Sequence, residues 1–193
     1  MSTDTANRVI GPATLRPRGR PRRAALGWVA VLTLVAVLLE VSVMPYVNVA
    51  DGIPDLIAPT VVAIALLRGS LVGAMVGFSA GMLVELTAPI GTLGVLALLY
   101  LAVGAWCGRY CEREESSSLL APLVLSVAAT LFVQLGYMFF QLMLGNSMPA
   151  SEFVGQVLVP TLALTALLSP PVVLIARRRL GAPRVVEPYS VIG

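Results

Sequence analysis

The chain has 193 residues, of which 58% are hydrophobic and 12% are charged, and its 13 basic and 10 acidic residues give a net charge of +3. A soluble domain has about 25% charged residues, so this composition indicates a membrane protein. The sequence contains no histidine, and every basic residue is arginine. These absences exclude histidine triads, histidine metal sites, Walker-type phosphate loops and Schiff-base lysines.

Residues 1–23 form a proline- and arginine-rich stretch with almost no apolar content. Such a stretch cannot bury a core, so we predict a disordered basic tail. Beside a membrane span, its arginines are expected to attract anionic lipid rather than nucleic acid. The apolar run that follows, 24–43, is longer than the roughly 7–15 residues of a signal-peptide core. We therefore interpret this run as a retained membrane span.

The remaining apolar runs predict an all-α, polytopic membrane protein with one transmembrane domain at 24–178 and a short tail at 179–193. A typical span needs about 20 apolar residues, and shorter runs can be accommodated by local thinning of the bilayer. Arg68-Gly69-Ser70 is read as a turn, because one continuous helix would place Arg68 in mid-bilayer. The six predicted spans are 24–43, 54–67, 70–86, 92–107, 119–144 and 154–176.

Two features mark the ends of the later spans. The charged segment 108–118 is predicted to be a loop after the fourth span. In the sixth span, Pro160 and the Pro170-Pro171 pair are expected to bend or break the helix.

The arginines predict the orientation. With six spans, all 13 arginines fall on one side of the membrane, in four segments. The positive-inside rule then places both termini in the cytoplasm. The four segments are the N-terminal tail, the Arg68 turn, the 108–118 loop and the C-terminal group Arg177, Arg178, Arg179 and Arg184.

Four glycines recur every four residues in and before the third span: Gly69, Gly73, Gly77 and Gly81. Small residues at this spacing let two membrane helices approach closely. The ladder therefore predicts a tightly packed helix pair. The spacing alone leaves open whether the second helix belongs to this chain, to another protein, or to a second copy in a homodimer.

Four polar residues are candidates for polar contacts within the membrane or at its outer face. Glu40 and Glu85 are carboxylates within apolar runs, which suits an ion or substrate site, a partner contact, or simple proximity to the outer interface. Asp55 opens the second span and is a good helix N-cap. Gln134, in mid-span with Gln141 seven residues later, is expected to hydrogen-bond across helices.

The two cysteines, Cys107 and Cys111, share one helix face. Without further soft ligands they cannot close a zinc site, so we read them as two reduced thiols. No catalytic constellation emerges, and we expect no metal or cofactor.

A series of short motifs lies between residues 54 and 109. The series begins with Pro54-Asp55 before a short span and continues with the Arg68-Gly69 turn. The later elements are Gly73, Gly77-Phe78, Gly81, Glu85, Gly91-Thr92-Leu93-Gly94, Tyr100, Gly104 and Gly108-Arg109. The individual motifs are mostly glycines, but in their joint order they resemble the rod shape-determining protein MreD family. Glu85 departs from the family, which more often has aspartate there, and the basic tail is longer than in the family.

The resemblance implies a bacterial inner-membrane protein without enzymatic activity. It also implies binding to the bitopic membrane protein MreC and cooperation with the synthases of the cell-wall elongation machinery. The implied fold is similar to the substrate-binding S-components of energy-coupling-factor vitamin transporters.

The alternative function is a small-molecule binding subunit of such a transporter, with Glu40, Glu85, Gln134 or Tyr137 as pocket groups. The first span argues against this alternative, because it lacks the Ala-x-x-x-Ala spacing that those subunits use to engage their transport partner: Ala30 is followed four residues later by Leu34, and Ala36 by Glu40.

Overall fold

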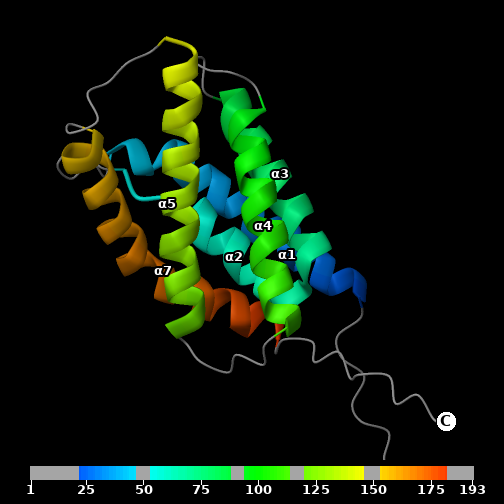
Figure 1. Ribbon diagram of the computed structural model, residues 1–193. Helices are drawn as coiled ribbons and strands as arrows, with labels where there is room; N and C mark the ends of the chain where they lie inside the picture. Colours follow the sequence, from blue (N-terminus) through cyan, green and yellow to red (C-terminus); the bar gives the residue numbers. More distant parts are fainter. Residues whose placement is uncertain (1–21, 47–52, 88–93, 114–119, 146–152, 182–193) are drawn as a thin grey trace, which may run out of the picture.

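The computed structural model describes residues 22–46, 53–87, 94–113, 120–145 and 153–181, and this part of the chain consists of helices joined by short turns, without strands (Figure 1). The predicted all-α class is thus confirmed for these residues. The predicted tails, 1–23 and 179–193, lie largely outside them. The helices are α1 (Arg22–Ser42), α2 (Ile57–Arg68), α3 (Ser70–Thr87), α4 (Val95–Arg113), α5 (Leu120–Met143) and α7 (Val159–Leu180), with the short helical turns η1 (Met44–Tyr46) and η2 (Phe153–Leu158).

The fourth helix is longer than the sequence predicts. The sequence predicts a span at 92–107 followed by a loop at 108–118, but α4 continues to Arg113. Hydropathy locates the end of the apolar run, whereas helical hydrogen bonding continues for as long as the residues tolerate it. The last turns of α4 are therefore helical but polar.

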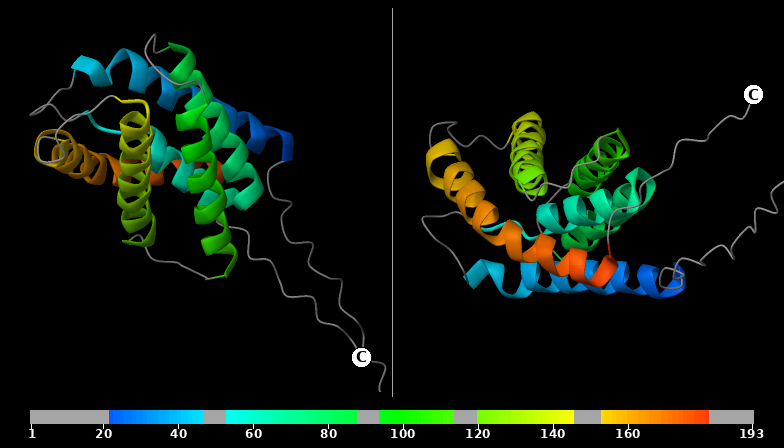
Figure 2. Two further views of the ribbon diagram at one scale, coloured as in Figure 1. Left: turned by 45° about the horizontal axis from the view of Figure 1, so that its top comes forward. Right: turned by 90° about the horizontal axis from the view of Figure 1, so that it is seen from below.

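Prolines shape the last helix without interrupting it. The π-helical turn η2 leads directly into α7, and Pro160 lies in the first turn of α7, just after this change in helix type. Pro170 and Pro171 lie inside α7, which bends along its length (Figure 2) but continues to Leu180. The expected bend is present, and the alternative of a break at Pro170-Pro171 is wrong.

Helix α2 occupies the centre of the bundle (Figures 1 and 2). It contacts each of the other described α-helices, and every residue from Ile57 to Ala65 is buried. A helix that is apolar on all sides must be surrounded by other helices. At about 1.5 Å per residue, its 12 residues extend for only about 18 Å, less than the roughly 30 Å of a hydrocarbon core. The N-terminal end of α2 is buried within the bundle, where its backbone groups need protein partners.

Helices α3 and α4 form the closest pair, and the glycine ladder lies between them. A Cβ atom on Gly77 would collide with the carbonyl oxygen of Tyr100, and one on Gly81 would lie 2.6 Å from the Cα atom of Ala97. From the other side, Gly104 is packed equally tightly against the backbone of Gly73. Of the partners that the spacing left open, the structure places a helix of the same chain against the ladder.

Gly69 has a different role from the rest of the ladder. It stands between α2 and α3 with a φ of 91°, a value that strongly favours glycine. The predicted turn at Arg68-Gly69-Ser70 is present at this position.

Helices α5 and α7 expose large apolar side chains on the surface of the bundle and bury hydroxyl groups in its interior. On α5, Leu120 and Met143 are 69% and 66% exposed, while Ser126 and Thr130 are completely buried. On α7, Leu167 is 74% exposed, while Thr165 is completely buried. Three helical segments are long and apolar enough to cross a membrane: Ser70–Thr87, Leu120–Met143 and Phe153–Leu180. The apolar segments of α1, α2 and α4 are shorter.

We expect Gly77→Ala to destabilise the bundle by about 1–3 kcal/mol, because the added methyl group meets backbone that cannot rotate away. Thermal unfolding of the purified protein in detergent measures this effect. Gly27→Ala is the matched control, since Gly27 has nothing within 4 Å of its added Cβ. Equal melting temperatures for the two variants would contradict the close approach of α3 and α4.

Candidate functional site

The candidate site is a buried polar cluster at the N-terminal end of α2. Asp55 is 4% exposed, and its Oδ1 accepts hydrogen bonds from the N–H groups of Ile57 and Ala58, both at 2.9 Å. This is the capping arrangement that the sequence predicts for Asp55. The carboxyl oxygens of Asp55 also lie at the positive end of the α2 dipole.

Glu40, on α1, completes the cap of α2. Its Oε2 accepts the N–H of Leu56 at 2.7 Å across 16 residues of sequence. The next backbone positions need no further acceptor, since Pro59 has no N–H and the N–H of Thr60 bonds to the carbonyl of Leu56. All of the orphan donors at this helix end are therefore satisfied by two carboxylates.

Three further helices bring a hydroxyl group close to Asp55, at its carboxylate or at its backbone N–H. The hydroxyl of Tyr100, on α4, donates to Oδ2 at 3.0 Å. The N–H of Asp55 itself donates to Oγ1 of Thr165, on α7, at 3.1 Å and 110 residues away. The hydroxyl of Thr130, on α5, lies beside the carboxylate but outside hydrogen-bonding geometry. With Glu40 from α1, the start of α2 is a junction of five helices.

Glu85 makes a second cap of the same kind. It lies near the end of α3, it is buried, and its two carboxylate oxygens accept the N–H groups of Gly94 at 2.8 Å and Leu96 at 2.7 Å. It thereby holds the N-terminal end of α4 beside the C-terminal end of α3. Glu40 and Glu85, the two carboxylates within the apolar runs, thus each bind backbone N–H groups at the start of the next α-helix.

Arginines gather at the opposite end of the bundle. Nη2 of Arg68 donates to the carbonyl oxygen of Leu180 at 3.0 Å. The guanidinium of Arg179 lies 4.6 Å from the centre of the Trp28 ring, a cation–π contact between α7 and α1. Arg177, Arg178 and Arg179 all lie in the last turn of α7, where positive charge stabilises the helix dipole.

Gln134 and Cys107 do not join the polar cluster. Gln134 is half-buried on α5, and Gln141 donates to the hydroxyl of Tyr137 at 2.8 Å within the same helix. The bond between Gln141 and Tyr137 lies within α5, so it is not the bond between helices that was expected for the glutamines. Cys107 is buried with a free thiol, while the side chain of Cys111 is outside the described part.

Sequence reasoning missed the buried hydroxyl groups. Thr161, Thr165 and Ser169 lie four residues apart on α7, and Ser126 and Thr130 are four apart on α5; all five are essentially fully buried. This spacing was the signal that could have found them, because it places each set on one helix face. Thr161 and Thr130 have hydroxyl oxygens without a hydrogen bond in the described part of the chain.

The arrangement suits structural rather than metal chemistry. No group of three or more acidic or thiol side chains that could hold a metal ion is present among the described residues. Three of the carboxylate oxygens each hold one N–H group, and Asp55 Oδ1 holds two. The residues of this site fix the positions of helices.

No family model, curated protein or solved structure matches this chain.

We expect Tyr100→Phe to lower the stability by about 1–3 kcal/mol, because it removes the hydrogen bond that the Tyr100 hydroxyl donates to the buried Oδ2 of Asp55. Tyr46→Phe makes the same chemical change at a side chain that is 89% exposed and should leave the melting temperature unchanged. The comparison uses thermal unfolding of both variants in the same detergent. A Tyr100→Phe protein as stable as the Tyr46→Phe protein would disprove this role of the tyrosine hydroxyl.

Proposed function

We propose that the chain is a non-enzymatic scaffold of the bacterial cell-wall elongation machinery, of the MreD kind, embedded in the inner membrane. In this proposal the six helices each cross the bilayer, both termini are cytoplasmic, and the protein binds a bitopic partner such as MreC. This partner and the associated synthases would determine cell shape together with it.

The polarity of the bundle supports the membrane location. Large apolar side chains point outward from α5 and α7, while serine and threonine hydroxyls point inward. In lipid, outward apolar groups cost nothing, and small hydroxyl residues allow close packing inside. In water, the same surface would be an extended apolar patch of the kind that soluble monomers avoid.

The distribution of charge supports the orientation. Arg68, Arg109 and Arg177–Arg179 lie at one end of the bundle, and Glu40, Asp55 and Glu85 lie toward the other. An arginine-bearing end is expected to face the cytoplasm.

One observation carries the functional proposal: the residues on which the MreD resemblance rests build a single structural unit. Asp55 is bonded to Tyr100, and Glu85 is bonded to Gly94. Gly73 of α3 faces Gly104 of α4, Gly77 lies against the backbone of Tyr100, and Gly108 is packed against the backbone of Ser70. Contacts that join these motif residues into one core support common architecture, and carboxylates bonded to backbone N–H groups support a structural role.

The same contacts make the vitamin-binding alternative less favourable. Glu40 and Glu85 are engaged by backbone N–H groups, and the Tyr137 hydroxyl accepts from Gln141. Three of the four groups considered for a ligand pocket thus have partners within the protein.

The orientation predicts which positions an impermeant thiol reagent reaches in intact cells. In a background with Cys107→Ala and Cys111→Ser, we expect Tyr46→Cys and Leu144→Cys to be labelled from outside. Arg178→Cys, an exposed position at the arginine-bearing end, is the control and should be labelled only after the membrane is permeabilised. Labelling of Arg178→Cys in intact cells, or protection of the other two, would overturn the threading.

The role in cell shape predicts that depletion of the protein converts rod-shaped host cells into spheres. Expression of the parent chain should restore rods and should co-purify the MreC-like protein, whereas Gly77→Leu should do neither because its helix pair cannot form. Gly27→Leu, at an open position, is the matched control and should restore rods. Cells that stay rod-shaped on depletion, together with a vitamin bound to the purified protein, would favour the transport alternative.

A further inference from the structure

Two carboxyl groups lie next to each other at the start of α2. Oε2 of Glu40 accepts the N–H of Leu56. Oδ1 of Asp55 accepts the next two N–H groups, those of Ile57 and Ala58. Because these N–H groups are consecutive, the two carboxyl groups are neighbours, close enough to interact electrostatically. If both were ionised, two like charges would repel each other at one helix end.

The helix itself balances only part of this charge. The N-terminal end of a helix carries the equivalent of about half a positive elementary charge, whereas two ionised carboxyl groups carry two negative ones. Asp55 is buried and Glu40 is half-buried, and a buried charge is costly unless an opposite charge accompanies it. The start of α2 therefore needs one more positive charge.

The arginines of the described helices lie too far away to supply this charge. The sequence contains no lysine and no histidine, and each described arginine lies at the opposite end of its helix from the Glu40–Asp55 pair. These arginines are Arg22 and Arg23 at the start of α1, Arg68 at the end of α2, Arg109 and Arg113 at the end of α4, and Arg177, Arg178 and Arg179 at the end of α7.

The other helices around α2 present no cation to the pair either. The Tyr100 hydroxyl, on α4, donates to Oδ2 of Asp55, and the Thr165 hydroxyl, on α7, accepts the Asp55 N–H. The titratable side chain of α3 is that of Glu85, which is bound to the start of α4. From α5, the group beside Asp55 is the hydroxyl of Thr130.

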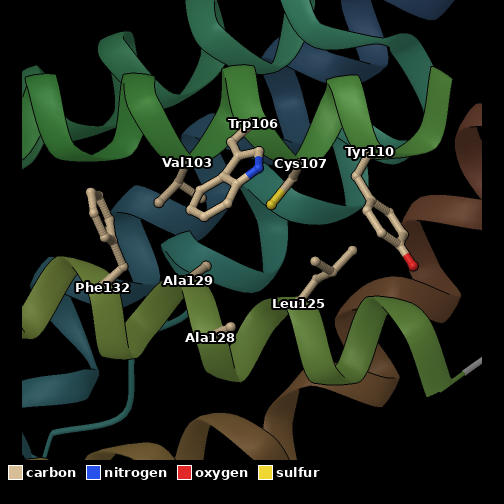
Figure 3. A pocket seen from close by; sticks show the side chains of 8 residues that line it. All are labelled: Val103, Trp106, Cys107, Tyr110, Leu125, Ala128, Ala129 and Phe132. Atoms are coloured by element: carbon tan, nitrogen blue, oxygen red, sulfur yellow. The ribbon is translucent and has the colours of Figure 1, made fainter. Parts of the chain in front are cut away.

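The interface between α4 and α5 continues beyond Tyr100 and Thr130 as a groove (Figure 3). Val103, one turn after Tyr100, and Ala129, next to Thr130, are among the side chains that line it. None of its eight lining side chains is charged. The groove therefore brings no cation toward Asp55 from the arginine-bearing end of the bundle.

One hydroxyl group beside the pair lacks a hydrogen bond. Thr130 is completely buried, and its Oγ1 lies beside the Asp55 carboxyl group without a hydrogen-bond partner in the described part of the chain. Buried hydroxyl groups are nearly always bonded, so this oxygen marks a place for one more donor. A protonated carboxyl group is a donor, whereas an ionised one only accepts.

We infer that the start of α2 is a proton-binding site, at which Glu40 and Asp55 together hold one proton at neutral pH. The proton supplies the missing positive charge and leaves a single negative charge at the positive end of α2. A protonated carboxyl group keeps an acceptor oxygen, so the bonds to the α2 backbone are retained. This inference rests on the contacts at α2, and it does not depend on a role in cell shape or on a protein partner.

Infrared spectroscopy of the purified full-length protein in detergent detects such a proton, because protonated and ionised carboxyl groups have different C=O stretching bands. We expect the protonated band in the parent protein at neutral pH. Glu40→Gln and Asp55→Asn should each abolish it, because the remaining carboxyl group then ionises without a charged neighbour. Glu85→Gln is the matched control and should leave the band in place, since Glu85 caps α4 without a second carboxyl group.

The pH dependence of stability is a second measurement of the same proton. The folded pair holds a proton that a carboxyl group in the unfolded chain has lost by neutral pH, so the parent protein should become less stable as the pH rises. Between about pH 6 and pH 8, its folding equilibrium constant should fall about tenfold per pH unit relative to that of Glu40→Gln. The glutamine keeps an oxygen that can accept the Leu56 N–H. Thermal unfolding of both proteins in the same detergent gives the comparison.

Several results would overturn the inference. They are a parent protein without the protonated band, a band that survives in Glu40→Gln or in Asp55→Asn, and an equal pH dependence of the parent and Glu40→Gln proteins. Stability that rises with sodium concentration instead of falling with pH would assign the missing charge to a metal cation. Because these measurements involve no protein partner, their failure would leave the cell-shape experiment unaffected, and the reverse also holds.

Discussion

A short helix in the middle of an apolar bundle exposes backbone donors to surroundings that offer no water, and each unsatisfied donor there costs several kcal/mol. This constraint governs the structure around α2. Its first N–H groups are accepted by Asp55 and Glu40, and Asp55 is in turn held by Tyr100 and Thr165. Because the four residues come from different parts of the chain, satisfying one helix end also fixes how α1, α4 and α7 sit around it. The cap is thus a tertiary contact as much as a local one.

The opposite ends of the helices are fixed by other means. At the C-terminal end of α2, Arg68 complements the helix dipole and reaches the end of α7 through the Leu180 carbonyl. Between α3 and α4, direct backbone contact at Gly77 and Gly104 replaces side-chain interdigitation. Without a hydrophobic driving force between helices in lipid, close van der Waals contact and hydrogen bonds must hold them together. Carboxylate caps at one end, glycine contacts along the middle and arginine contacts at the other end meet this requirement.

The sequence predicted the features that depend on nearby residues. The turn at Gly69, the capping role of Asp55 and the close packing of the glycine ladder all follow from spacing and residue type. It could not identify partners that are distant along the chain, such as Leu56 for Glu40 or Thr165 for Asp55, because these depend on how the helices are placed. The extension of α4 to Arg113 was missed because apolar content and helical bonding end at different residues. The buried hydroxyls of α7 were overlooked although their four-residue spacing is visible in the sequence. Serine and threonine occur both inside and outside a bundle, so their spacing alone does not show which helix face is buried.

The use of polar groups inside the bundle restricts what its surface can recognise. The carboxylates of Glu40, Asp55 and Glu85 all bind backbone N–H groups. The side chain of Glu112 lies outside the described part. What α5 offers outward is apolar over most of its length. Recognition at this surface must therefore depend on shape, with charge contributing only where helices such as α4 emerge from the apolar region. A rigid frame of this kind suits a protein that positions other membrane components, since the geometry of its grooves is set by backbone contacts that binding does not need to rearrange.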